Sequence, residues 1–242
     1  MKILSDAFKY STWLWEPKDF DAKFVDVNRI SRIFLEFNSD NKEATYRNIL
    51  QTPDVVFEAL VSDNRWLTDD KKFTPKFVFD NYNKYKFSAL HLDLEFWVGA
   101  DKKLNKVRAK KLIQLILEFK NRLKCKINID LPIWFYNEYR EEYEVLQPMV
   151  DEITYMAYFT NPAPIKNCLD VIKKVQKVPF VLSYELAALP DSPSSSFHGK
   201  DINDMLMMHR TIYESEQGYF NKLMNICPAI HHFKTLVNWK KK

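Results

Sequence analysis

Apolar and polar residues alternate with a period of two in a series of short runs along the chain. In "ALHLDLEF", residues 89–96, leucine or phenylalanine at every even position from 90 onward alternates with His91, Asp93 and Glu95. Because successive side chains of a strand point to opposite faces, this run predicts a strand with one apolar face and one ionisable face. Seven further runs also predict strands, at residues 11–15, 32–38, 56–63, 126–134, 151–158, 179–186 and 227–233.

Segments with apolar residues at helical spacing lie between these runs. The longest covers residues 102–123, and residues 138–148, 163–176 and 202–217 are similar. Strands that alternate with helices indicate a parallel sheet, and eight such units close into a barrel. The predicted fold class is therefore α/β, with a single (β/α)8 TIM barrel domain over residues 1–242. A loop rich in Pro and Ser, residues 189–201, follows the seventh strand, where barrel enzymes carry binding loops.

The polar face of each strand is expected to point into the barrel, because the apolar face packs on the outer helices. The last inward residues then meet at the C-terminal mouth, and they are Glu36, Asn38, Asp93, Glu95, Asp130, Tyr158, Glu185 and His231. The basic residues near these strands, Arg32 and Lys126, lie at the starting ends, so the acids predict a site more than a set of ion pairs. His91 is two residues before Asp93 on the same inward face, and it is expected to orient that carboxylate by a hydrogen bond.

Composition excludes several other classes of protein. Gly occurs only 3 times, which excludes Gly-rich phosphate loops, and a net charge of +4 spread along the chain does not indicate nucleic-acid binding. The three cysteines are widely spaced, which argues against a disulfide framework and a thiolate zinc site. No apolar stretch is long enough for a membrane span or a signal peptide, so we expect a cytoplasmic protein unless a leader was removed. The sequence does not indicate an oligomeric state.

The acids at the end of the fourth run suit general acid catalysis. Asp93 and Glu95 are two residues apart on one face, with Cα atoms about 6.6 Å apart. Like charges this close raise the pKa of one carboxyl group, and glycoside hydrolysis needs such a proton donor. Trp97 and Trp134 stand near strand ends, where aromatic faces can stack on a sugar or fill the core.

In their order, the motifs "LHLDLE", "DLPIW" and "VDEITYMAY", followed by a Glu-bearing seventh strand, resemble a group of bacterial glycoside-hydrolase-like barrels that are distantly similar to the family 18 chitinase clan. The segments "ALVSDNRW" and "IHHFKTLVNW" also resemble that group, so the resemblance covers nearly the whole chain. It implies a general acid at Glu95, a supporting carboxylate at Asp93 and a substrate-holding hydroxyl at Tyr158. Ala89 and His91 replace the Gly and the earlier Asp of the chitinase motif, and Phe159 replaces an Asp, so substrate-assisted chitin cleavage is not implied.

We therefore expect a glycoside hydrolase acting on a carbohydrate or glycoconjugate without a cofactor or metal. Glu95 is its general acid/base, Asp93 supports it, and Glu185 is the second carboxylate. A carboxylate separation of about 5–5.5 Å would indicate a retaining mechanism, and about 6.5–9.5 Å an inverting one. The expected substrate-binding residues are Tyr158, Asp130, Trp134, Trp97, Glu36, Asn38 and His231.

Two alternatives remain open at this stage. One is a metal-dependent barrel hydrolase or isomerase, with a divalent ion held by the acids and His231, although no H-x-H spacing supports it. The other is a non-catalytic barrel that binds carbohydrate and retains the acids.

Overall fold

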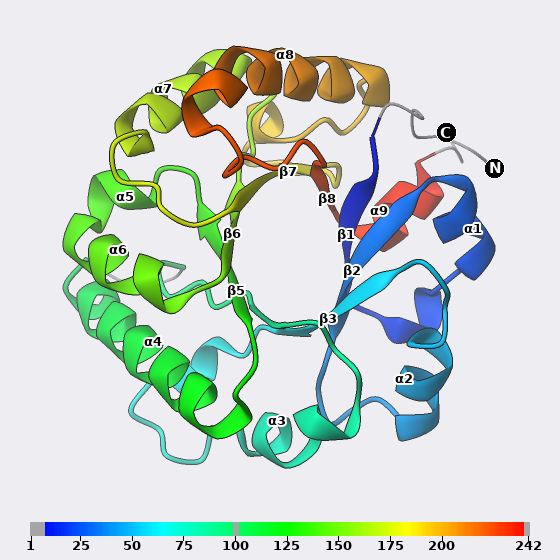
Figure 1. Cartoon of the computed structure of the whole chain (residues 1–242), viewed down its shortest axis with the longest axis vertical. Coiled ribbons are helices and arrows are strands. Elements are labelled where there is room, and N and C mark those ends of the chain that lie inside the picture. The colour runs from blue at the N-terminus through cyan, green and yellow to red at the C-terminus, as the bar shows by residue number, and fades with distance from the viewer. Residues whose placement is uncertain (1–7, 99–101, 240–242) are drawn as a thin grey trace.

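The computed structural model describes residues 8–98 and 102–239. In this part of the chain eight parallel strands form a closed barrel, in which each strand pairs with its neighbours in sequence order and β8 pairs with β1 (Figure 1). The predicted (β/α)8 barrel is confirmed. The strands are β1 (Tyr10–Leu14), β2 (Ile30–Glu36), β3 (Val56–Val61), β4 (Leu90–Leu92), β5 (Ile127–Pro132), β6 (Glu152–Met156), β7 (Phe180–Glu185) and β8 (Ala229–His231).

Helices surround the barrel on its outside (Figure 1). They are α1 (Ala22–Val27), α2 (Glu43–Ile49), α3 (Lys76–Asn81), α4 (Lys102–Leu123), α5 (Phe135–Glu138), α6 (Arg140–Leu146), α7 (Pro162–Ile172), α8 (Ile202–Phe220) and α9 (Phe233–Asn238). Helix α4 has the bounds that its periodicity predicts, because Leu112, Ile116 and Phe119 recur at helical spacing and are buried. The helices of the first third of the chain are six or seven residues long, too short for a clear periodic signal.

The two faces of the strands follow the predicted alternation. Leu90 and Leu92 belong to the large outer core between strands and helices, as do Ile129 and Leu131. A second, small apolar cluster lies inside the barrel and consists of Trp13, Phe34, Leu60, Val181 and Ala229. Charged side chains also point into the barrel, where Arg32, Glu58, His91 and Asp130 contact one another in sequence.

Strand β4 is shorter than its alternating pattern suggests. Pairing with β3 and β5 ends at Leu92, and after the bond from the Asp93 N–H to the Val61 carbonyl the chain turns. Leu94 and Phe96 remain buried, so buried and polar side chains continue to alternate after the hydrogen bonds to the neighbouring strands have ended. The prediction of a strand through residue 96 is therefore wrong at its end, and Glu95 lies on the loop that follows β4.

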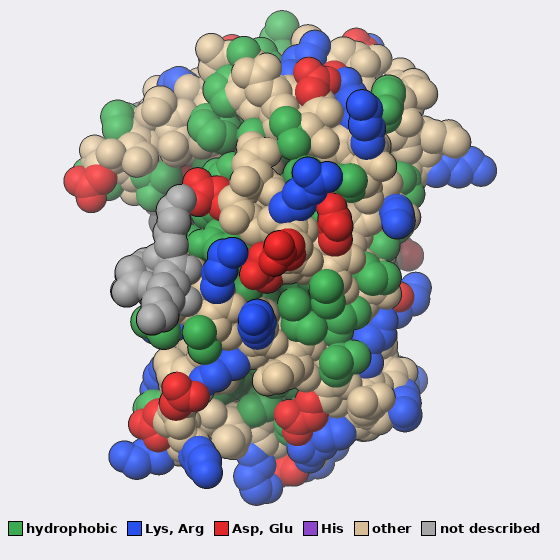
Figure 2. All heavy atoms as spheres, turned by 90° about the vertical axis from the view of Figure 1, so that its left-hand side faces the viewer, with side chains coloured by type: hydrophobic (Ala, Val, Ile, Leu, Met, Phe, Trp, Pro, Cys, Tyr) green, Lys and Arg blue, Asp and Glu red, His purple; other side chains and the backbone are tan. Residues whose placement is uncertain are grey.

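The outer surface over α4, α5 and α6 carries interspersed charges of both signs (Figure 2). Ion pairs between residues four apart contribute to this pattern, such as Arg122 with Glu118 and Arg140 with Glu144. Such a surface is typical of solvated outer helices. None of the helices in the described ranges is long and apolar enough to cross a membrane.

Candidate active site

A chain of charged hydrogen bonds runs up the inside of the barrel. His91 lies at its centre and is fully buried, with Nδ1 2.7 Å from Glu58 Oε2 and Nε2 2.7 Å from Asp130 Oδ1. The ring also stacks on Phe34, with ring centroids 3.9 Å apart. Toward the N-terminal end of the barrel, Arg32 pairs with Glu58 at 3.4 Å. The chain of contacts therefore links β2, β3, β4 and β5.

Glu58 and Asp130 each accept a further hydrogen bond. Asn128 Nδ2 donates to Glu58 at 2.9 Å, and the Trp13 indole N–H donates to Asp130 Oδ2 at 2.9 Å. Burial on its own favours a neutral imidazole, but Asp130 and Glu58 outweigh it and raise the pKa of His91 to about 10. Burial likewise opposes charge on Glu58, yet His91 and Arg32 lower its pKa to about 2. His91 is thus an imidazolium held between two carboxylates.

These contacts correct one expectation and add one residue. His91 was expected to orient Asp93, but its two nitrogens bind Glu58 and Asp130 instead. Glu58 was not among the predicted residues. The alternation of residues 56–63 could have identified it. Phe57, Ala59 and Val61 form the apolar outer face of this run, so Glu58 lies on the face that points into the barrel.

Glu95 lines a cavity at the C-terminal mouth with a volume of about 300 Å³. Trp97 and Trp134 form part of its wall, with ring centroids 6.2 Å apart, and Met156 and Tyr158 form another part. The loop after β7 contributes Leu189, Ser192 and Ser195. This loop therefore lies at the rim of the mouth, as its sequence position suggests. The two tryptophans from the loops after β4 and β5 meet beside the carboxyl group.

Both acids of the motif have raised pKa values. Burial is the main cause for Asp93, followed by the charges of Asp130 and Glu95, and the pKa lies well above its usual range. Asp93 Oδ1 is buried and has no hydrogen-bond partner. For Glu95 the pKa is raised first by burial and then by Asp130. Burial therefore contributes more to both shifts than the repulsion between the two neighbours.

Tyr158 is the common neighbour of the acids. Burial raises its pKa well above the ordinary value, and four acidic residues raise it further, in the order Glu185, Asp93, Asp130 and Glu95. The phenol therefore keeps its proton and can donate a hydrogen bond. Around Tyr158 the structure thus brings together four of the five acids that the alternation of the strands predicts at the mouth, all except Glu36.

Glu185 is held from two sides and is almost completely buried. Its Oε1 accepts from the Ala187 N–H at 2.6 Å, and its Oε2 lies 2.6 Å from His231 Nδ1. The Trp15 indole N–H donates to His231 Nε2 at 3.1 Å. Because an indole nitrogen only donates, Nε2 is the acceptor and the His231 proton sits on Nδ1, where it is donated to Glu185.

Two other predicted residues lie elsewhere on the mouth. Glu36 and Asn38 line a separate cavity of about 410 Å³ together with residues of the loop after β3. Burial and Asp40 raise the pKa of Glu36. Asn38 Oδ1 accepts from the Asp40 N–H and from Asn41, so it closes a local turn. The structure does not bring these two residues into the cavity of Glu95.

No protein-family model matches the chain, and no curated protein matches its sequence. Solved structures match its fold. A family 18 chitinase from Crocus vernus superposes with a TM-score of 0.58 at 12% identity, covering 95% of this chain and 94% of its own. A GH113 β-1,4-mannanase gives 0.56 at 9% identity, with 96% and 89% covered. The PgaB (BpsB) glycoside hydrolase domain from Bordetella bronchiseptica gives 0.53 at 9% identity, with 97% and 96% covered.

The chain shares its (β/α)8 barrel fold with these glycoside hydrolases. This likeness concerns the fold, because the identities are low. Within the barrel, Glu95, Trp97, Trp134 and Tyr158 share one cavity, and Asp93, Asp130, Glu185 and His231 are not among the residues that line it. Asp130 is hydrogen-bonded to His91, and Glu185 to His231. Among residues 8–98 and 102–239, no group of three His, Cys, Asp or Glu residues is arranged to hold a metal ion.

Proposed function

We propose that this protein cleaves a glycosidic bond in a carbohydrate, with Glu95 as general acid. The observation that carries the proposal is the position of Glu95, a carboxyl group of raised pKa in an aromatic-walled cavity at the barrel mouth. A carboxylic acid that keeps its proton near neutral pH can protonate the leaving oxygen. The tryptophan rings beside it suit the C–H faces of a sugar.

Asp93 and Tyr158 bind and orient the substrate in this proposal. Both keep their protons, so both donate hydrogen bonds to oxygen atoms of a sugar. The unpartnered Asp93 Oδ1 supports this role, because a buried polar atom without a partner is costly and a bound ligand would satisfy it.

Glu185 is the proposed second carboxylate, at the end of β7, three strands away from β4 in the barrel. Two donors, the Ala187 N–H and His231, hold its oxygen atoms in place, and a nucleophile or a general base has to be positioned in this way. The anomeric configuration of the first product, followed by NMR on a panel of aryl glycosides and oligosaccharides, distinguishes retention from inversion. Carbohydrate binding without hydrolysis across the whole panel would contradict the proposal and favour a non-catalytic barrel.

Asp130→Asn is expected to move the alkaline limb of the pH–rate profile to lower pH. Asp130 is the negative charge that raises the pKa of Glu95, so without it the acid loses its proton at lower pH. Asp93→Asn is expected to shift the limb less, because Asp93 is not among the charges that raise the pKa of Glu95. The measurement is kcat/KM against pH for both variants. An equal shift in both would show that Asp93 is charged in the working enzyme.

Trp134→Ala is expected to raise KM roughly three- to tenfold with a smaller change in kcat. The ring supplies binding surface beside Glu95 but does not donate or accept the transferred proton. Trp134→Phe keeps a flat ring and is expected to recover most of the affinity. A large fall in kcat at unchanged KM would place Trp134 in the chemical step instead of in binding.

A further inference from the structure

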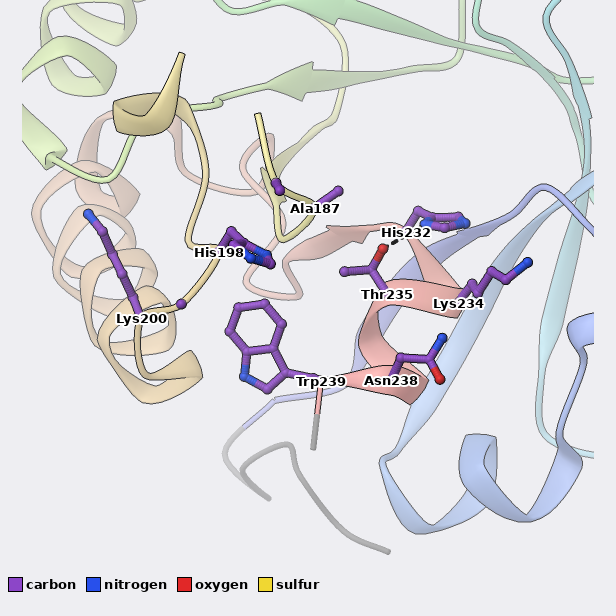
Figure 3. A pocket seen from close by; sticks show the side chains of 10 residues that line it. Ala187, His198, Lys200, His232, Lys234, Thr235, Asn238 and Trp239 are labelled. Carbon is purple, nitrogen blue, oxygen red and sulfur yellow. Dashed lines mark hydrogen bonds between the residues drawn. The ribbon is translucent and has the colours of Figure 1, made fainter. Parts of the chain in front are cut away.

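A second cavity lies beside the mouth, between the loop after β7 and helix α9 (Figure 3). Its volume is about 450 Å³, larger than the cavity of Glu95. The rings of His198 and Trp239 form one side, with centroids 6.4 Å apart and nearly perpendicular planes. His232 and Thr235 lie across from them, with His232 Nδ1 2.9 Å from Thr235 Oγ1.

The local sequence explains how these groups reach one space. Gly199 has a φ of 75°, a conformation that side chains other than glycine adopt at a cost, and it turns the loop between His198 and Lys200. On the other side, β8 ends at His231 and α9 starts two residues later, which places Thr235 and Trp239 on the short final helix or directly after it. Two segments about 40 residues apart in sequence therefore enclose the cavity.

The lining of this cavity contains no Asp or Glu. Burial, together with the neighbouring His231 and Lys234, lowers the pKa of His232. The side chains of Lys200 and Lys234 extend away from the enclosed space, and Lys234 pairs with Glu16 and Asp19. A tryptophan ring with an imidazole, a hydroxyl and the Asn238 amide around it suits a ligand that has an apolar face and several hydroxyl groups.

The second cavity shares its wall with the proposed active site. The loop after β7 lines the cavity of Glu95 with Ser192 and Ser195, and it lines the second cavity with Ala187 and His198. The N–H of Ala187 binds Glu185. His231, which binds Glu185, directly precedes His232 of the second cavity. The loop after β7 therefore contributes to both cavities.

We propose that this cavity is a second carbohydrate-binding site, which holds a neutral pyranose unit against Trp239. Because it adjoins the mouth, the unit belongs to the same oligosaccharide whose bond lies at Glu95, so the substrate is an oligomer and not a glycoside of a single sugar. This second statement rests on the proposed function. The binding of the unit itself does not.

Binding is measured on the full chain carrying Glu95→Gln, with β-1,4-linked hexasaccharides of glucose, N-acetylglucosamine and mannose as probes. The chain has six tryptophans, so its indole N–H signals in NMR can be assigned by single Trp→Phe replacements. A bound hexasaccharide is expected to shift the signals of both Trp239 and Trp134. Trp239→Ala is expected to weaken binding roughly three- to tenfold, and Trp239→Phe to restore most of it.

Tyr219→Ala is the matched control, because Tyr219 is an exposed aromatic residue on α8 that lines neither cavity. It is expected to leave the affinity unchanged. A hexasaccharide that shifts Trp134 but not Trp239, or no binding of any probe, overturns the second site. Binding at Trp239 by a protein whose unmodified form cleaves no oligosaccharide keeps the site and overturns the proposed function, so the two failures are distinct.

Discussion

Replacing Glu95 by Gln is expected to lower kcat about 10²–10⁴-fold while carbohydrate binding stays largely intact. The amide has the shape of the carboxyl group but no proton to give to a leaving oxygen. Burial and Asp130 raise the pKa of Glu95, which is why we propose this group as the proton donor of the mouth cavity. The loss is measured as kcat on an aryl glycoside and, separately, as the dissociation constant for the intact substrate.

Two comparisons make this result specific to the proton donor. An aryl glycoside with an acidic leaving group needs less protonation, so the variant is expected to lose less on it than on a poor leaving group. Glu118→Gln makes the same chemical change on the exposed surface of α4, where Glu118 pairs with Arg122, and is expected to keep full activity. Unchanged turnover in Glu95→Gln would remove Glu95 from the mechanism.

The alternation of residues predicted the architecture well because burial on both faces of a barrel strand constrains side chains strongly. In β5 and β7 the alternation predicts that Asp130 and Glu185 point into the barrel, and they do so in the structure. The ends of elements were harder to predict. Beyond Leu92 the chain still buries every second side chain, although it no longer forms hydrogen bonds with the neighbouring strands. The alternation therefore could not predict that β4 ends at Leu92.

Hydrogen-bond partners across the barrel could not be predicted from the sequence. The alternation places His91 and Asp93 on the same face of the strand. Adjacent strands are staggered, however, so the hydrogen-bond partners of His91 come from β3 and β5 and not from its own strand. The separation of Glu36 from Glu95 has a similar cause, because side chains at the mouth turn with their loops into different cavities. A sequence shows which residues point inward, while the loops decide which of them share a cavity.

His91→Leu is expected to destabilise the fold by about 3–5 kcal/mol, because it removes the cation between two buried carboxylates. Asp130 and Glu58 would then repel each other with fewer donors to satisfy them. This loss is a large part of the roughly 5–15 kcal/mol that stabilises a typical domain. The measurement is the free energy of unfolding in urea at pH 7, with circular dichroism used to establish that the variant is folded before denaturant is added.

The pH dependence of stability separates this charged role from simple packing. The pKa of His91 is about 10 in the folded protein against 6.5 for an ordinary histidine. Its contribution is therefore complete below about pH 6.5 and is lost as the pH rises through 10. His91→Leu is expected to lack this alkaline loss.

His209 provides the matched control, since it is equally buried but neutral. Burial lowers its pKa to about 4, and its nitrogens bind the Tyr184 hydroxyl and the Ile226 carbonyl. His209→Leu is expected to cost about 1–3 kcal/mol and to keep the loss of stability between pH 6.5 and 10. If His91→Leu shows the same alkaline loss of stability as the unmodified protein, then His91 is not the cation that holds Glu58 and Asp130 together. Arg32, which pairs with Glu58, would then be the cation that offsets the negative charge inside the barrel.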